Sequence, residues 1–394
     1  MKGKRVFLYV QHLLGIGHLR RAVTLANALA AAGLEVTLAS GGCPVNGLAL
    51  DGVRFVQLPP ARAMDASFRV LVEPDGTPID ETWKSMRQAF LLDAWRDADP
   101  HALILELYPF GRRQMRFELV ALLEAATSAV HRPLIVSSVR DVLGGGQTNL
   151  ARQDGMLEVF ERYFDRVLVH ADPEIIPFSR TFRHAEKIQA RLHYTGYVVD
   201  RVSPPPDDLP DGPVGENEVM ISAGGGAVGM RLLETALRAM PHSRLAGRTW
   251  RVLTGVNASD TSLKALAAIA EETGEGQIAV ERARPDFANL LARCAVSVSQ
   301  GGYNTVMEII QAGARAVVVP FAGGAEIEQT LRARSFAARG LIGILEEDAL
   351  TPESLASAID QAADRARPSP GALDLNGAER TAALIASWTT DYEW

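Results

Sequence analysis

The chain has 394 residues, which is enough for two domains that each bury a core of their own. An apolar fraction of 47% and a charged fraction of 22% are typical of a globular protein and exclude a disordered chain. The formal net charge of −7 excludes a protein that binds nucleic acid through a broadly basic surface.

The two cysteines, Cys43 and Cys294, are far apart and lack CxxC spacing, so neither a zinc site nor a disulfide scaffold is expected. We find no secretory signal and no apolar run approaching the roughly 18 residues of a membrane span. These observations predict a cytoplasmic protein without a transmembrane segment and leave room for peripheral contact with a membrane.

The first forty residues predict a strand, a loop, a helix and a second strand. Arg5–Val10 is a continuous apolar run, typical of a strand covered on both faces. The helix carries Ala22, Leu25 and Leu29 with helical spacing, and the next strand covers 36–39. This βαβ unit implies a parallel sheet.

The same alternation continues through the first half of the chain. Strands are predicted at 102–107, 134–139 and 167–170, with a helix over 115–126. Residues 1–202 are therefore predicted to form a doubly wound, Rossmann-like α/β domain.

A proline-rich stretch that also carries acidic residues divides the two halves, and we predict a linker over 203–217. The second half repeats the alternation over 218–375, and residues 376–394 are predicted to form a final helix. Two domains of this kind would face each other across a cleft, where the carboxyl ends of parallel strands bind ligands. Strands are expected at 219–222, 251–253, 278–281, 296–299 and 316–320, with a helix over 230–240.

A glycine-rich loop follows the first strand of the second half. Glycines between a strand and a helix let the backbone approach a phosphate, which the helix amino terminus attracts. The loop lacks the Lys-Ser/Thr of a P-loop, so a tight turn without ligand remains an alternative. The candidate phosphate contacts are Ser222, Gly224, Gly225 and Gly226.

A second loop of this kind ends the strand at 296–299. Asn304 or Thr305 is expected to cap the following helix, and Glu308 is expected on its first turn. A carboxylate there is suited to accept hydrogen bonds from two ribose hydroxyls, although it could instead only complement the helix dipole. The loop consists of Ser299, Gln300, Gly301, Gly302, Tyr303, Asn304 and Thr305.

The amino-terminal loop adds an imidazole to the same pattern. Gly17 is a candidate donor contact. His18 follows it at the start of a helix, where it could act as a general base or bind a phosphate or substrate oxygen. A histidine of the core or a helix cap is the alternative. Glu106 and Asp141, near strand ends, are alternative bases, unless they are helix caps or surface charges.

Taken together, these motifs resemble glycosyltransferase family 28, which includes the transferase that adds N-acetylglucosamine to the lipid-linked peptidoglycan precursor. The similarity is greater to a group of predicted bacterial glycosyltransferases. It covers nearly the whole chain and is strongest from about 280 to 345. The shared motifs are Gly17-His18-Leu19-Arg20-Arg21, Arg140-Asp141, Tyr194-Thr195-Gly196-Tyr197 and Gly301-Gly302-Tyr303-Asn304-Thr305.

The resemblance implies the two-domain GT-B fold and a nucleotide-sugar donor, usually a uridine diphosphate (UDP) sugar. It implies inversion at the anomeric carbon without a metal or other cofactor. The carboxyl-terminal domain would hold the donor, the amino-terminal domain the acceptor, and the last helix would return to the first domain. Glu308 would bind the ribose, Glu328 and Gln329 the donor sugar, and Arg282 and Ala283 the base through backbone groups, with His18 near the acceptor hydroxyl.

Two departures from the family pattern leave the donor sugar open. The peptidoglycan enzyme has a basic residue in place of Gln300 and a charged stretch in place of Ala322-Gly323-Gly324-Ala325. The acceptor is not indicated. A hydrolase or epimerase of nucleotide sugars and a non-catalytic nucleotide-sugar-binding protein remain as alternative functions.

Overall fold

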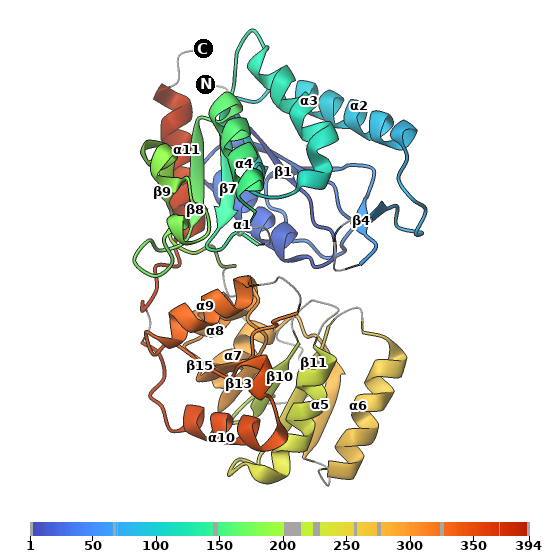
Figure 1. Ribbon diagram of the computed structural model, residues 1–394, viewed down its shortest axis with the longest axis vertical. Helices are drawn as coiled ribbons and strands as arrows, with labels where there is room; N and C mark the ends of the chain where they lie inside the picture. Colours follow the sequence, from blue (N-terminus) through green and yellow to red (C-terminus); the bar gives the residue numbers. More distant parts are fainter. Residues whose placement is uncertain are drawn as a thin grey trace. The chain divides into compact units, whose positions relative to one another are not determined.

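The computed structural model describes residues 3–65, 68, 70–144, 149–200, 214–223, 229–255, 258–273, 277–323, 327–369 and 371–391. The chain forms two compact units (Figure 1). The first unit comprises Met1–Val198 and Asn376–Trp394, and the second comprises Val199–Leu375.

Within its described residues, the first unit is built on a seven-stranded parallel sheet with the order β3-β2-β1-β6-β7-β8-β9. Five of the six residues of β1 are buried, as its unbroken apolar sequence predicts for a strand covered on both faces. The strands are β1 (Arg5–Val10), β2 (Glu35–Ser40), β3 (Val53–Gln57), β6 (Ala102–Glu106), β7 (Leu134–Arg140), β8 (Arg166–His170) and β9 (Leu192–Tyr194).

Helices cover this sheet, and the last of them comes from the far end of the chain. Helix α11 packs against α1 and contributes Ala378, Ala382 and Ile385 to the core of the first unit. The helices are α1 (Gly17–Ala31), α2 (Glu81–Ala98), α3 (Arg116–Thr127), α4 (Leu150–Tyr163) and α11 (Gly377–Asp391). The first unit also contains a small antiparallel strand pair, β4 (Arg62–Ala63) and β5 (Leu71–Val72). Its short 3-10 helices are η1 (Arg113–Met115), η2 (Phe178–Arg180) and η3 (Ala185–Arg191).

In the second unit, the described residues form a six-stranded parallel sheet with the order β12-β11-β10-β13-β14-β15. The strands are β10 (Val219–Ser222), β11 (Trp250–Thr254), β12 (Ile278–Arg282), β13 (Val296–Ser299), β14 (Ala316–Val318) and β15 (Gly343–Ile344). The helices are α5 (Met230–Ala239), α6 (Asp260–Thr273), α7 (Phe287–Arg293), α8 (Tyr303–Gln311), α9 (Glu328–Ala337) and α10 (Pro352–Ala363), with the short turns η4 (Met240–His242) and η5 (Glu347–Ala349).

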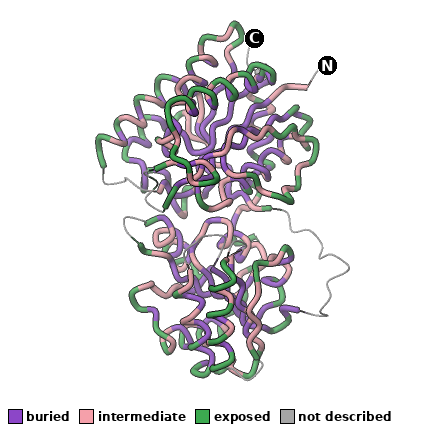
Figure 2. The backbone as a smooth tube through the Cα atoms, turned by 90° about the vertical axis from the view of Figure 1, so that its right-hand side faces the viewer, coloured by how far each residue is buried: buried purple, intermediate pink, exposed green. Residues whose placement is uncertain are grey.

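Each unit has its own hydrophobic core around its sheet, and buried residues gather in the centre of each (Figure 2). Each sheet also has one switch point, where strand order reverses: between β1 and β6 in the first unit and between β10 and β13 in the second. Open parallel sheets bind ligands beyond the carboxyl ends of the strands at such points.

The predicted doubly wound α/β architecture is confirmed, and the predicted strands at 219–222 and 296–299 agree with β10 and β13. Most of the predicted linker, 203–213, lies outside the described residues. Its remaining part, 214–217, forms a turn in which Gly215 packs on Leu290 and the Asn217 amide donates to the Arg293 carbonyl. This end of the linker therefore belongs to the second unit.

Candidate active site

The candidate donor site lies at the switch point of the second unit. There Ser222, the last residue of β10, is opposite Ser299, the last residue of β13. Both hydroxyl groups are buried without a hydrogen-bond partner among the described residues. The predicted phosphate contacts Gly224, Gly225 and Gly226 lie outside the described residues. The described part of the site is therefore the loop that follows β13.

Helix α8 begins earlier than the sequence suggested. Its N-cap is Gly302, with an extended backbone and no side-chain cap, so the prediction that Asn304 or Thr305 caps the helix is wrong. Both residues lie inside the first turn, since the helix starts at Tyr303. A helix start that no side chain caps presents its first amide groups and its positive dipole end to the loop, which suits an anion.

The loop glycine Gly301 is held by helix α9 at both of its backbone polar groups. The side-chain oxygen of Gln329 accepts hydrogen bonds from the Gly301 amide at 2.9 Å and the Phe321 amide at 3.0 Å. Nη1 of Arg332 donates to the Gly301 carbonyl at 2.9 Å. The Gly301 amide thus points at Gln329, and phosphate contacts must come from later amides of the loop.

The space at position 301 favours glycine. A β-carbon there would lie 3.1 Å from both the carbonyl oxygen and the β-carbon of Gln329. Helix α9 therefore sets both the position and the residue type of the loop.

Arg332 connects the predicted sugar-contacting residues to the loop. Its fully buried guanidinium pairs with Glu328 at 2.8 Å and lies over the ring of Tyr303 at 5.4 Å. Because the Tyr303 ring is buried as well, only the backbone of Tyr303 can meet a donor. The sequence analysis missed Arg332, although its place four residues after Glu328 on one helix was a usable signal.

Two other predicted contacts of the donor are placed as follows. Glu308 lies in the second turn of α8, not in the first as predicted, and is half-buried. Arg282 ends β12, where its side chain donates to the Ala258 carbonyl and to Asp260. Arg282 and Ala283 are exposed, so a nucleotide base would meet chiefly their backbone.

The candidate acceptor side is a histidine–carboxylate pair at the switch point of the first unit. His18, the second residue of α1, has Nδ1 at 2.8 Å from Oε1 of Glu106, the last residue of β6. Arg21, one turn further along α1, donates to the same oxygen. The side chains of Arg21 and Glu106 are buried, whereas that of His18 keeps 13% of its surface exposed.

Burial keeps His18 neutral. Burial lowers the pKa of His18 to about 3, and the positive charges of Arg112 and Arg140 add to this against the opposing charge of Glu106. Burial alone would raise the pKa of Glu106, but His18, Arg21 and Arg112 hold it well below its usual value. A neutral imidazole facing a carboxylate carries its proton on Nδ1, which leaves the Nε2 lone pair to accept a proton.

The alternative bases lie at strand ends, as predicted, since Glu106 ends β6 and Asp141 directly follows β7. Both are fully buried, so neither is the surface charge considered as an alternative. Glu106 is hydrogen-bonded to the His18 imidazole. Asp141 follows β7 directly, and its Oδ1 accepts a hydrogen bond from the Val142 amide at 2.9 Å.

A buried polar chain extends this edge of the sheet beyond β7. His170, at the end of β8, contacts the Ser138 hydroxyl through Nε2 and the Thr195 hydroxyl through Nδ1, both at 2.8 Å. The Thr195 carbonyl accepts a hydrogen bond from Arg380 of α11 at 3.0 Å. Helix α11 is thereby tied to the carboxyl edge of the sheet.

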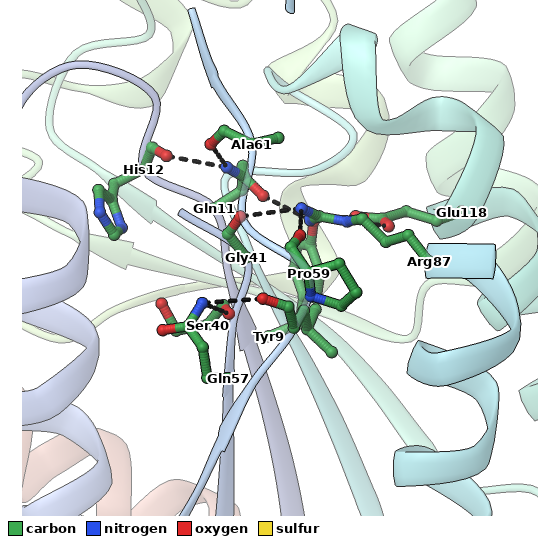
Figure 3. A network of polar contacts seen from close by, with 11 residues as sticks. Tyr9, Gln11, His12, Ser40, Gly41, Gln57, Pro59, Ala61, Arg87 and Glu118 are labelled. Atoms are coloured by element: carbon green, nitrogen blue, oxygen red, sulfur yellow. Dashed lines mark hydrogen bonds and ion pairs between the residues drawn. The ribbon is translucent and has the colours of Figure 1, made fainter. Parts of the chain in front are cut away.

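A second buried network fixes the backbone where β1 ends (Figure 3). Arg87 of α2 pairs with Glu118 of α3 at 2.6 Å, and Glu118 also accepts a hydrogen bond from Tyr9 at 2.5 Å. The same guanidinium donates to the Gln11 side chain at 2.6 Å and to the Gly41 carbonyl at 2.8 Å. This network positions the start of the loop that leads to His18.

Neither a metal site nor a membrane span is found in the described chain. No group of three or more histidine, cysteine, aspartate or glutamate side chains among these residues could hold a metal ion. No helix in them has both the length and the apolar sequence needed to cross a membrane.

Comparison with known proteins agrees with this geometry. Residues 220–373 match the glycosyltransferase family 28 C-terminal domain. Two curated relatives are UDP-N-acetylglucosamine–N-acetylmuramyl-(pentapeptide) pyrophosphoryl-undecaprenol N-acetylglucosamine transferases. The one from Syntrophotalea carbinolica is 36% identical over 74 residues, and the one from Dichelobacter nodosus is 38% identical over 80 residues. These matches cover 19% and 20% of this chain, which spans about a fifth of its relatives' length (21% and 22%).

Solved structures share the fold over nearly the whole chain. Acinetobacter baumannii MurG has a TM-score of 0.59 at 15% identity, covering 98% of this chain and 99% of its own. The spinosyn forosaminyltransferase SpnP has a TM-score of 0.59 at 17% identity, with 99% and 96% covered. The calicheamicin glycosyltransferase CalG4 has a TM-score of 0.56 at 16% identity, with 98% and 95% covered.

Two parallel sheets with alternating helices, together with these neighbours, define a GT-B fold, as predicted. Residues 220–373 of the second unit match the glycosyltransferase family 28 C-terminal domain, so the predicted family resemblance is confirmed for this part of the chain.

Proposed function

We propose that this protein is a glycosyltransferase that moves a sugar from a nucleotide-sugar donor, a UDP-sugar, to an acceptor hydroxyl without a metal ion. The observation that carries the proposal is the loop after β13, which leads into a helix start without a side-chain cap inside a family 28 domain. The UDP-N-acetylglucosamine named as donor of the curated relatives supports the nucleotide-sugar class of donor.

In this proposal the donor diphosphate is stabilised by backbone amides in place of a cation. The first amides of α8, at Tyr303, Asn304 and Thr305, and the glycine loop after β10 supply hydrogen bonds and the positive helix end. Their contribution grows as negative charge develops on the leaving diphosphate. Glu308 accepts hydrogen bonds from the ribose hydroxyls, and Gln329 and Arg332 keep the loop in place.

The acceptor is activated by His18. Nε2 of His18 takes the proton of the acceptor hydroxyl as its oxygen attacks the anomeric carbon. Bond formation from the face opposite the diphosphate inverts that centre, and the nucleoside diphosphate leaves. Glu106 receives the Nδ1–H hydrogen bond, sets the tautomer and stabilises the imidazolium that forms. Asp141, the second predicted catalytic residue, is fully buried directly after β7 and is proposed to support the site without touching the acceptor.

The test is a turnover assay with a panel of UDP-sugars and acceptors in the presence of a metal chelator. We expect UDP release that depends on both substrates, and a product with inverted anomeric configuration by nuclear magnetic resonance. Free sugar released equally well without any acceptor would identify a hydrolase instead. Loss of turnover in chelator, restored by a divalent cation, would contradict stabilisation by backbone amides.

A further inference from the structure

A strained loop follows β6 in the first unit, and the roles described above give it no task. Two of its residues that are not glycine, Leu107 and Arg112, have left-handed backbones with φ of 67° and 58°. Between them, the Gly111 amide donates to the Leu107 carbonyl at 2.8 Å, which holds the loop in this shape. A left-handed backbone is unfavourable for a residue with a β-carbon, and such strain is concentrated at functional sites. Glycine would therefore fit position 112 better than arginine does.

The side chain of Arg112 joins this loop to the loop that leads to His18. Its Nε donates to the Gln11 carbonyl at 2.7 Å. The side chain of Gln11 is already held by Arg87 (Figure 3), so Arg112 adds a second hold, on the backbone of the same residue. The hydrogen bond of Arg112 thus connects the segment before His18 with the segment after Glu106, and these two residues form the histidine–carboxylate pair.

The guanidinium of Arg112 has no carboxylate partner in the described chain. Its hydrogen-bond acceptor there is the Gln11 carbonyl, and it forms no ion pair with a described residue. Burial lowers the pKa of Arg112, and the positive charges of Arg140 and Arg21 add to this against the opposing charge of Glu106. A partly buried cation without an ion-pair partner destabilises the folded protein. Stability therefore explains neither the backbone nor the side chain of Arg112.

Charged groups from several elements face the imidazole of His18. Glu106 of β6 and Arg21 of α1 lie 2.8 and 3.5 Å from its Nδ1. Arg112, from the loop after β6, and Arg140, the last residue of β7, act on it through their positive charges. One carboxylate is thus set against three guanidinium groups, and protonation of His18 would add a fourth positive charge to them.

From this arrangement we propose that Arg112 is a positioning residue of the proposed base: it fixes the loop that leads to His18 and opposes protonation of the imidazole by a permanent positive charge. The inference rests on the proposed function, because an unprotonated imidazole matters where His18 takes the proton of the acceptor. A guanidinium does not lose its own proton, so its effect on His18 persists as the pH changes. The strained backbone serves to carry the guanidinium to this place.

Nuclear magnetic resonance of the histidine side chains, in the full chain without substrate, tests this assignment. At about pH 4 we expect about a tenth of His18 to be protonated in wild type and about half in Arg112→Met, since its pKa rises by about one unit. Arg112→Lys, which keeps the charge, should restore the wild-type fraction. Arg116→Met, which removes an exposed arginine of α3, is the matched control. Equal protonation of His18 in Arg112→Met and wild type would overturn the proposal.

Arg112→Gly separates this role from a contribution to stability. Glycine adopts the left-handed backbone without strain, so the thermal midpoint should stay equal or rise by about 2 °C, while His18 is protonated as in Arg112→Met. A lower midpoint together with unchanged protonation of His18 would make Arg112 a purely structural residue and contradict the assignment.

Turnover reports separately on the proposed function. The kcat/KM of Arg112→Met should begin to fall, on the acid side, about one pH unit above that of wild type, and Arg112→Lys should follow wild type. Wild type that releases no UDP with any donor and acceptor, while the difference in His18 protonation is present, would contradict the proposed function alone.

Discussion

The two candidate half-sites are built in opposite ways. In the first unit, side chains dominate: a buried carboxylate holds a neutral imidazole, and the buried Arg87–Glu118 ion pair fixes the loop before it. In the second unit, the backbone dominates: one glycine is held through its amide and its carbonyl by a neighbouring helix. An imidazole side chain can take the proton of an acceptor hydroxyl, which suits the role proposed for the first unit. Backbone amides donate hydrogen bonds to a diphosphate at any pH, which suits the role proposed for the second unit.

The largest effect is expected from removing the imidazole. His18→Gln should lower kcat by about 10²–10⁴-fold, the usual contribution of a general base, while UDP affinity stays unchanged. The exposed His242, replaced in the same way, is the control. Parallel steady-state kinetics and UDP titration measure the two quantities, and a fall in UDP affinity with kcat intact would assign His18 to the donor.

Breaking the buried ion pair of the first unit should cost more stability than breaking a surface pair. Arg87→Met leaves Glu118 buried without its cation, and we expect a loss of about 3–5 kcal/mol in the free energy of unfolding. Arg96→Met, which breaks the exposed pair with Asp93, should change it by less than about 1 kcal/mol. Denaturant unfolding measures both, and equal losses would contradict the structural role of this network.

In the second unit, the hydrogen bonds that hold the backbone of Gly301 should matter for UDP binding. Arg332→Met removes the donor to the Gly301 carbonyl and leaves Glu328 without its partner, and we expect about tenfold weaker UDP binding. Arg334→Met on the same helix is the control, because Arg334 pairs at the surface with Glu346. Calorimetry measures the UDP affinity of both variants. Identical affinities would contradict a role of Arg332 in UDP binding.

A dependence of stability on pH is also expected, and it arises in the first unit. Burial lowers the pKa of His18 and of His170 to about 3 in the folded chain, below the ordinary value of 6.5. The unfolded chain therefore binds more protons in this window, and stability falls as pH drops from about 6.5 to about 3. Each histidine contributes a slope of up to about 1.4 kcal/mol per pH unit.

His170→Gln should flatten this slope. Chemical denaturation at several pH values measures it, and an unchanged slope would contradict a neutral, buried His170.

Most of the fold could be predicted from the sequence, because buried parallel strands are continuous apolar runs that glycine or proline ends. The bounds of β1, β10 and β13 agree with the predicted runs. The helix cap could not be predicted: Asn304 and Thr305 are good capping residues, but the close approach of α9 to Gly301 sets where the turn lies.

Long-range pairs escaped the sequence analysis for a different reason. Glu106 was recognised as a candidate base, but its pairing with His18 joins residues 88 positions apart, which no local pattern encodes. The same holds for Arg87 with Glu118 and for Arg332 with Gly301. Residue types that carry chemistry could be selected from their motifs, whereas their partners required the sheet order.

The most direct test of the central claim is a calorimetric titration of UDP in the presence of a chelator, with wild type and Glu308→Gln. The account predicts that wild type binds UDP without metal and that Glu308→Gln, which keeps the shape but loses the charge that accepts ribose hydrogen bonds, binds it about tenfold more weakly. Absence of UDP binding to wild type, or equal affinity of the two proteins, would contradict a nucleotide site on helix α8.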